Sequence, residues 1–225
     1  MNISTAEENY LKAIFKIVEK EGGPALTNAI AATMQTTAAS VTDMLKRLAD
    51  KQLLTHEKYR GAQLTPTGQR VATSLIRKHR LWEVFLVEKL GFAWDEVHDL
   101  AEQLEHIQGD ELVHRLDAFL GRPRFDPHGD PIPDAEGHWM LREQLPLSAL
   151  APGQGGLVSG VGDHSTSFLQ YLDQLGIALG TPLSVLSRTA YDQSAQVLIR
   201  DREAVLSDKV AQNLFVKPSP TTPES

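Results

Sequence analysis

The stretch "TAASVTDMLKRLADKQLLTHEKYRGAQLTPTG", from Thr37 to Gly68, decides the fold of the N-terminal part of the chain. Its first half repeats apolar residues at the three- and four-residue spacing of a helix that buries one side, at Val41, Met44, Leu45, Leu48 and Leu53. Residues 54–57 and 62–64 then predict two short strands that pair around Tyr59-Arg60-Gly61. A helix that opens with small residues and leads into a hairpin is typical of a winged helix-turn-helix.

Two further helices are predicted before this stretch. Residues 5–20 carry a helical apolar stripe at Tyr10, Leu11, Ile14, Phe15, Ile17 and Val18. The sequence Gly22-Gly23-Pro24 ends that helix, and Thr27 is expected to cap a second one, "NAIAATM". Three helices followed by a hairpin complete the winged helix-turn-helix, which we place at residues 1–73.

The chain beyond the hairpin is predicted to be helical at first. Residues 66–90 read as one long helix with a proline in its first turn, and helices are expected at 93–107 and 109–121. Their apolar faces are wide for so small a region, which indicates pairing with a second copy of the chain. A proline- and glycine-rich loop follows from Arg122 to Gly137.

The period of the pattern changes in the last third. The segments "GLVSGVGD", "PLSVLSRTA" and "QVLIRD" predict strands, with a helix at "STSFLQYLDQLG" between the first two. We therefore expect a linker at 141–155, a small SH3-like β-barrel at 156–216 and a disordered tail at 217–225. The helical region at 74–140 makes the whole protein mainly α.

Composition limits the possible chemistry. The 225 residues include no cysteine, so disulfides and thiolate metal sites are excluded and any metal must be held by nitrogen and oxygen ligands. No signal peptide and no membrane-spanning run is apparent, so we expect a soluble cytoplasmic protein. The net charge is −7, but residues 1–80 hold 12 Lys and Arg against 7 Asp and Glu. A basic N-terminal part on an acidic body is compatible with DNA binding.

One polar cluster points to a metal. In "DLAEQLEHIQGDE" a helix would place Glu102, Glu105 and His106 on one face, with His98 one turn earlier. Carboxylates and imidazoles gathered in this way are ligands for a divalent cation. A solvated polar face with a chance histidine is the alternative interpretation.

Taken together, six segments resemble the diphtheria-toxin-repressor family of metal-dependent transcriptional repressors, which includes manganese-transport regulators. They are "EENYLKAIF", "AASVTDMLKRL", "LTPTG", "RKHRLWEVFL", "VHDLAEQLEH" and "DPHGDPIP". The resemblance covers residues 5–140, and more loosely the barrel. It implies a helical dimerisation and metal-binding domain at 74–140, and a homodimer that binds operator DNA when loaded with metal.

The resemblance also implies two metal sites. One would use Asn9 with Glu102, Glu105 and His106. The other would use His79, Glu83 and His98, completed by a barrel residue, for which Asp163 is the candidate with His164 beside it. In some manganese-type relatives the proline-rich loop contributes as well, which here indicates His128 and, more weakly, Asp126.

Two departures from the family pattern bear on the metal. Iron-type members have a cysteine where this chain has Glu102, so an oxygen ligand and the absence of sulfur favour Mn²⁺, with Fe²⁺ as the alternative. Asn9 stands where the family has methionine or aspartate. Lys12 stands where some small manganese regulators have a second-metal glutamate, which argues against a closely spaced two-metal cluster.

The expected mechanism is a change in the spacing of two DNA-reading helices when metal joins the first helix to the dimer body, so that the dimer reads a palindromic operator. The small and polar residues of the third helix would face the bases: Thr37, Ala39, Ser40, Thr42 and Asp43. The backbone contacts would come from Lys46, Arg47, Tyr59 and Arg60.

Three alternatives remain open at this stage. One is an iron-responsive repressor of the same family. Another is a metal-dependent helical-bundle enzyme, of the kind in which two facing helices each carry a Glu-x-x-His motif. No second Glu-x-x-His occurs on a facing helix here, so we predict that the protein is not an enzyme. The third is a DNA-binding protein whose polar cluster is only structural.

Overall fold

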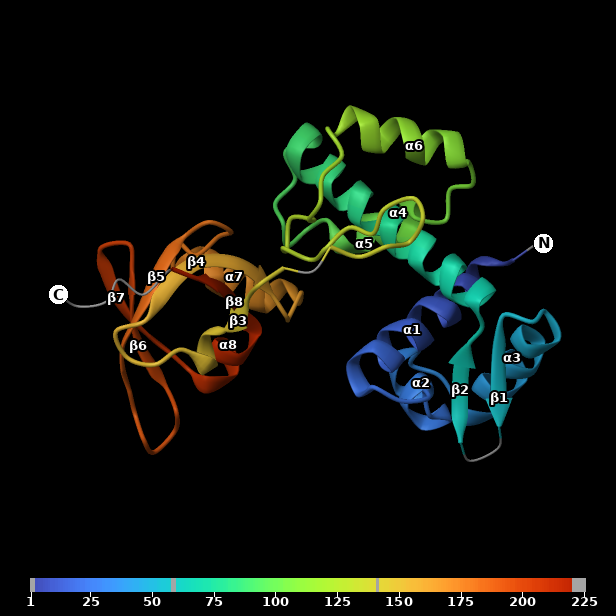
Figure 1. Ribbon diagram of the computed structural model, residues 1–225, viewed down its shortest axis with the longest axis horizontal. Helices are drawn as coiled ribbons and strands as arrows, with labels where there is room; N and C mark the ends of the chain where they lie inside the picture. The colour runs from blue at the N-terminus through green and yellow to red at the C-terminus, as the bar shows by residue number, and fades with distance from the viewer. Residues whose placement is uncertain (1–2, 58–59, 141, 220–225) are drawn as a thin grey trace. The chain divides into compact units, whose positions relative to one another are not determined.

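The computed structural model describes residues 3–57, 60–140 and 142–219 (Figure 1). These residues divide into two compact units. Unit 1 comprises the described residues up to His79, together with 104–110 and 133–139. Unit 2 comprises 80–103, 111–132 and the described residues from Met140 onward. One boundary falls inside helix α4 (Pro66–Leu90), directly after His79.

Unit 1 contains the predicted winged helix-turn-helix. Helices α1 (Thr5–Glu21), α2 (Thr27–Thr33) and α3 (Ala38–Asp50) lead into strands β1 (Leu54–Glu57) and β2 (Gly61–Leu64), which pair antiparallel. The apolar stripes of the helices meet in one core. Its larger members are Leu11, Ile14, Ile30, Leu45, Leu48 and Leu53.

Local sequence signals explain where these helices begin and end. Ser4 and Glu7 form a capping box at the start of α1, and Gly22 ends it in the left-handed conformation with a φ of 69°. Thr37 caps α3 by accepting a hydrogen bond from the Ser40 amide. The predicted cap at Thr27 is wrong, because Thr27 is the first residue of α2 and Leu26 precedes it without a side-chain cap.

The helix predicted at 93–107 is shorter than expected. Helix α5 runs only from His98 to Leu104. Before it, the Glu96 carboxylate accepts a hydrogen bond from the Ala93 amide and holds a turn. After it, Glu105 and His106 lie in a turn that belongs to unit 1. The sequence predicts that Glu105 and His106 lie on the same helical face as Glu102. In the structure the helix ends before both residues, so they do not extend that face.

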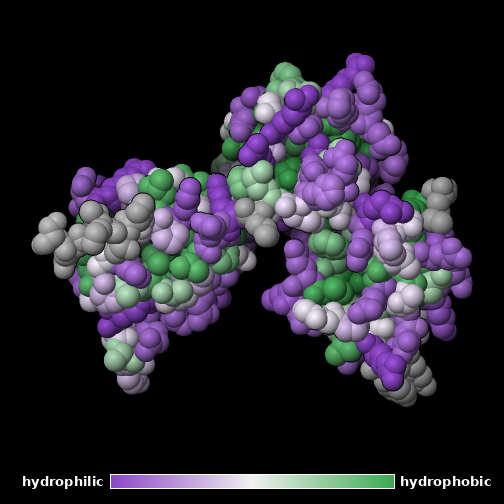
Figure 2. All heavy atoms as spheres, in the orientation of Figure 1, coloured by the Kyte–Doolittle hydropathy of each residue, from purple (hydrophilic) through white to green (hydrophobic). Residues whose placement is uncertain are grey.

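The helical part of unit 2 is built around the second half of α4. Leu81 and Val84 pack against α6 (Asp110–Phe119), and Ile132 from the proline-rich loop closes the cluster. Large apolar side chains remain exposed around it, at Leu90, Phe92, Leu112 and Phe119. Figure 2 shows green apolar atoms breaking the purple surface in the region that Figure 1 labels α4 and α6.

The C-terminal part of unit 2 is an antiparallel sheet of six strands in the order β3-β8-β4-β5-β6-β7. The strands are β3 (Leu145–Pro146), β4 (Gly155–Val161), β5 (Pro182–Arg188), β6 (Ala195–Ile199), β7 (Arg202–Leu206) and β8 (Leu214–Pro218). A short 3₁₀ helix, η1 (Leu147–Ala149), follows β3, and helices α7 (Thr166–Gln174) and α8 (Asp208–Asn213) complete the domain. Strand β3 lies in the stretch that the sequence assigned to a linker, and strands β7 and β8 were not predicted individually.

The proline-rich loop packs directly on strand β4. The Val161 amide donates to the His128 carbonyl over 3.0 Å. Gly129 has a φ of +89°, and a Cβ there would lie 2.2 Å from the carbonyl oxygen of Ser159. The close approach of two backbones therefore needs glycine at this position.

The predicted fold class is confirmed: the protein is mainly α, with a winged helix-turn-helix, a helical region and a small SH3-like β domain. Among the described residues, no helix combines the length and the apolar character needed to span a membrane.

Candidate metal centre

Glu105 is the centre of a buried polar cluster in unit 1. Its side chain has no exposed surface, and its Oε2 lies 2.6 Å from Nδ1 of His79. His106, the next residue, has its Nε2 3.7 Å from the other Glu105 oxygen. An imidazole from α4 and one from the turn after α5 thus meet on one carboxylate.

Helix α1 supplies the opposite side of this cluster. Glu8 and Lys12 are four residues apart, so they share one face of the helix. The Glu8 carboxylate lies 2.6 Å from Nδ1 of His106, and the Lys12 ammonium contacts both Glu105 oxygens at 2.6 and 2.9 Å. Glu8 was not among the predicted site residues, although it lies one residue before Asn9 on a capped helix.

Asn9 lies between these two residues in the sequence of α1. Its side-chain oxygen is buried and has no hydrogen-bond partner among the described residues. An unsatisfied buried acceptor costs stability, so it requires an explanation. An amide oxygen is a ligand that a hard or borderline divalent cation accepts. The donors of unit 1 therefore fit such an ion.

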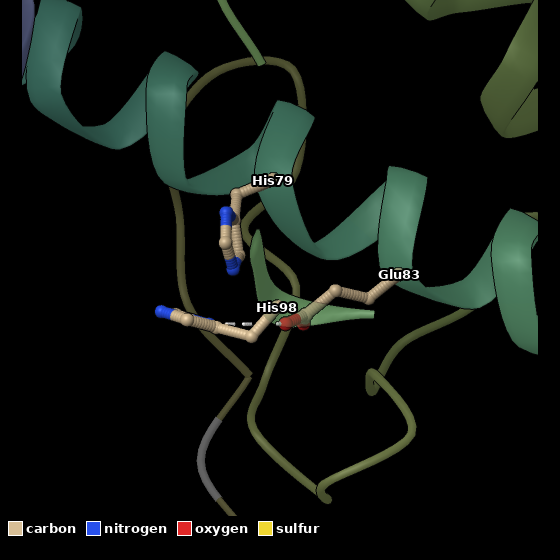
Figure 3. A group of neighbouring side chains, drawn as sticks. All are labelled: His79, Glu83 and His98. Atoms are coloured by element: carbon tan, nitrogen blue, oxygen red, sulfur yellow. Dashed lines mark ion pairs between the residues drawn. The ribbon is translucent and has the colours of Figure 1, made fainter. Parts of the chain in front are cut away.

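Unit 2 holds a second group, around Glu83. His98 Nδ1 lies 3.6 Å from one Glu83 oxygen and His128 Nδ1 lies 3.7 Å from the other. Asp126 joins Glu83 and His128 in a set whose ligand-type atoms all lie within 4.8 Å of one another. Figure 3 shows His79 and Glu83 on successive turns of α4, with the Glu83 carboxylate turned toward His98.

The electrostatics of this second group are unusual for a protein interior. Burial raises the pKa of Asp126 to about 7, and the charges of Glu83 and Asp130 act in the same direction. Burial by itself lowers the pKa of His128, but the nearby Glu83 carboxylate outweighs it, with a further contribution from Asp126, and the pKa is raised to about 9. Arg80 partly balances the acids, because its guanidinium lies 3.4 Å from Asp126 and 2.7 Å from Asp130.

The barrel reaches this group through a different residue from the one expected. Asp163 accepts a hydrogen bond from the Ser165 amide at the start of α7 and joins none of the ligand groups found among the described residues. Its neighbour His164 stacks on the His128 ring, with ring centroids 4.6 Å apart, and has its Nε2 4.0 Å from Asp130. The two-residue Asx turn of Asp163 explains the difference, since it uses the carboxylate to order the loop.

The other predicted ligand, Glu102, lies in the last turn of α5. Its side chain is 35 % exposed, and its carboxylate is 3.9 Å from Nε2 of His98. The boundary between the two units lies between Gln103 and Leu104, so Glu102 belongs to unit 2 and Glu105 to unit 1.

The residues predicted to contact DNA cover the outer face of α3 and the hairpin. Most of them are exposed: Thr37, Ala39, Ser40, Asp43, Lys46, Arg47 and Arg60. Thr42 is half-buried and its hydroxyl donates to the Ala38 carbonyl, and Thr37 and Ser40 are joined by the α3 cap. Tyr59 lies outside the described residues.

Three family profiles match successive parts of the chain. The profile of the N-terminal DNA-binding domain of iron-dependent repressors matches residues 2–62, and that of their metal-binding and dimerisation domain matches residues 65–134. The FeoA domain profile matches residues 145–218.

The chain is also similar in sequence to individual curated repressors. The diphtheria toxin repressor of Corynebacterium jeikeium is 38% identical over 144 residues, which are 64% of this chain and 58% of the relative. The iron-dependent repressor IdeR of Mycobacterium leprae is 35% identical over 126 residues, 56% of this chain and 54% of that protein. The chain thus spans little more than half the length of these curated relatives.

A solved structure covers more of the chain. A manganese-dependent transcriptional repressor in complex with manganese is 35% identical, with a TM-score of 0.85 over 95% of this chain and 100% of that one. The protein belongs to the diphtheria toxin repressor family of metal-dependent transcriptional repressors, which includes iron-dependent and manganese-dependent members.

Proposed function

We propose that this protein represses transcription by binding operator DNA as a homodimer when a divalent metal is bound. The observation that carries the proposal is the buried cluster at Glu105, where imidazoles from two segments meet a carboxylate that also pairs with Lys12 of α1. The enzyme alternative is not supported, because the family consists of transcriptional repressors.

Helix α1 links the cluster to the DNA-reading helix. On one side it carries Glu8, Asn9 and Lys12, and on the other its Leu11 and Ile14 pack in the core with Leu45 of α3. A metal that draws on Asn9 and Glu105 together would fix the position of α1, and α3 would follow because the two helices share that core. Metal binding then favours the DNA-competent conformation of the ensemble.

For the first metal site we propose Asn9, Glu102, Glu105 and His106, with Glu8 as an additional ligand or orienting group. When bound, the metal supplies a fixed positive charge that joins these side chains. Their donors are nitrogen and oxygen only, which favours Mn²⁺ with Fe²⁺ as the alternative. The relatives include both iron-dependent and manganese-dependent proteins, so the residues themselves are the basis for this preference.

For the second site we propose Glu83 and His98, together with His79 one turn before Glu83 on α4. The loop residues Asp126 and His128 complete it, since both are buried against Glu83. His164 replaces Asp163 as the barrel residue that supports the site, by packing on the His128 ring.

For the DNA complex we propose that the exposed face of α3 enters the major groove. Ala39, Ser40 and Asp43 face the bases, while Lys46, Arg47 and Arg60 contact phosphates. In a dimer the two α3 helices would read a palindromic operator. The exposed apolar side chains around α4 and α6 are the surface we propose for dimerisation.

The test is binding to a palindromic operator fragment taken from upstream of the protein's own gene or of a neighbouring transporter gene. It is run at fixed salt with chelator, Mn²⁺, Fe²⁺ and Zn²⁺, for the wild type, Glu105→Ala and Glu19→Ala. Glu19 is an exposed carboxylate on α1 and serves as the matched control.

We expect wild type and Glu19→Ala to bind only with Mn²⁺ or Fe²⁺, and Glu105→Ala to lose at least about 100-fold in affinity, or roughly 2.7 kcal/mol. Tight operator binding by the wild type in chelator would show instead that the polar cluster is structural. The preferred metal in the same assay decides between a manganese and an iron sensor.

A further inference from the structure

Lys12 occupies the place in the Glu105 cluster where a cation is needed. It lies on α1, three residues after Asn9, and only 5 % of the residue is exposed. Its ammonium contacts both oxygens of the fully buried Glu105 carboxylate, and it lies 3.5 Å from Nδ1 of His79.

A buried carboxylate needs a counter-charge, because burial removes the water that would otherwise stabilise it. In this structure Lys12 provides that charge. The proposed metal would provide it in the loaded state, and it would use the same Glu105 oxygens. Both oxygens are already within hydrogen-bond distance of Lys12, so a metal has to take at least one of them. It would then stand within a few ångströms of another positive charge, and the two would repel each other.

Resting on the function proposed above, we propose that Lys12 is a built-in counter-ion which holds Glu105 in the metal-free protein and which a divalent metal must displace. Lys12 thereby sets the metal concentration at which the sensor responds. It also keeps α1 attached to the 104–110 segment without metal, through the Lys12–Glu105 pair. Loading with metal exchanges that attachment for one that runs through Asn9 on the same helix face.

The exchange gives the switch two defined states. A protein without this lysine would carry an uncompensated negative charge at Glu105 and would bind metal more tightly, at lower metal concentration. Its metal-free form would also be less stable, because removing one partner of a buried pair leaves the other charge unpaired.

The test measures Mn²⁺ affinity directly, by calorimetry and by the electron paramagnetic resonance signal of free Mn²⁺, on the full chain. The variants are Lys12→Met, Lys12→Gln and Lys12→Arg, with Lys20→Met as the control. Lys20 is an exposed lysine on the same helix, so this control removes the same charge away from the cluster. Gln keeps a hydrogen-bond donor without the charge, and Arg keeps the charge.

We expect Lys12→Met and Lys12→Gln to bind Mn²⁺ about tenfold tighter than wild type or more, and Lys20→Met to be unchanged within a factor of two. Lys12→Arg should stay close to wild type. Both neutral variants should show a lower melting temperature in chelator and a larger rise with Mn²⁺ than the wild type. Folding that requires Mn²⁺ would be the extreme form of the same result.

Equal or weaker Mn²⁺ affinity in both neutral variants, with the wild type binding normally, would overturn the role of Lys12 and leave the proposed function intact. If the wild type binds no divalent metal, the proposed function fails. In that case Mn²⁺ binding by Lys12→Met would still support the role of Lys12, and its absence would overturn both.

Discussion

Glu7 shows how one carboxylate can stabilise two neighbouring segments. Its Oε2 accepts a hydrogen bond from the Ser4 amide at 2.8 Å, while its own amide donates to the Ser4 hydroxyl at 3.3 Å. The same carboxylate lies 2.7 Å from the ammonium of Lys51, the residue that ends α3. Glu7 therefore caps α1 and also ties it to the end of α3.

This arrangement predicts an acid-dependent stability. Burial raises the pKa of Glu7, but the hydrogen bonds and charge of Lys51 and the Ser4 contacts outweigh it, so the pKa lies below the ordinary value of 4.5. A carboxyl with a lowered folded-state pKa adds stability above the unfolded value, and this contribution is lost as the pH falls through the folded value.

Glu7→Gln should therefore lower the free energy of unfolding at pH 7 by about 1 kcal/mol. The gap to wild type should close as the pH falls below 4.5. Urea unfolding of both proteins from pH 7 to pH 3 measures it, with Glu19→Gln as the exposed control on α1. A gap that stays constant over this range would contradict the assignment.

At the scale of elements, the junction between α3, β1 and α4 depends on very close packing. The Thr65 amide donates to the Leu53 carbonyl and the Thr65 hydroxyl donates to the Gln52 carbonyl. Gly68 lies in the first turn of α4, and a Cβ there would come within 1.9 Å of the Leu53 carbonyl oxygen. Only glycine lets the helix pass this close to the backbone at the start of the hairpin.

We expect Gly68→Ala to destabilise unit 1 by about 2 kcal/mol or more, because the obstacle is backbone that has little freedom to move. The matched control is Gly23→Ala, where a Cβ would meet nothing within 4 Å. Thermal unfolding of the two variants gives the comparison. Equal melting temperatures would mean that the junction is looser than this packing indicates.

At the scale of the whole molecule, the exposed apolar side chains around α4 and α6 form the surface we propose for dimerisation. Phe119 is 66 % exposed although it packs near Phe85, with ring centroids 6.5 Å apart. Leu90 and Leu112 are exposed as well, and exposed apolar groups of this size favour contact with another protein surface. The family of this chain has a dimerisation domain over the same residues.

Phe119→Glu should weaken dimerisation and reduce operator binding together, since a charge in an apolar interface is costly. Sedimentation velocity of the metal-loaded protein measures the first effect and operator titration the second. Tyr191→Glu is the control, because Tyr191 is 98 % exposed in a turn of the β domain. A fully dimeric Phe119→Glu protein would place the interface elsewhere.

The sequence by itself determined the helices of unit 1, the long helix α4 and the kind of ligand that a metal site here could offer. Helix periodicity acts over a few residues, so it can be read from the chain directly, although the predicted cap at Thr27 was wrong. The same applies to the spacing of His79 and Glu83 on one helix. The shortening of α5 was not predicted, because a competing turn at Ala93–Glu96 interrupts the helical pattern.

Only the tertiary structure decided which polar groups meet. Lys12 pairs with Glu105 across 93 positions of sequence, and Glu8 meets His106 across 98. His164, and not Asp163, reaches the loop histidine because a local turn uses the Asp163 carboxylate. Such contacts depend on how the folded core orients each side chain, and no short-range pattern records that orientation.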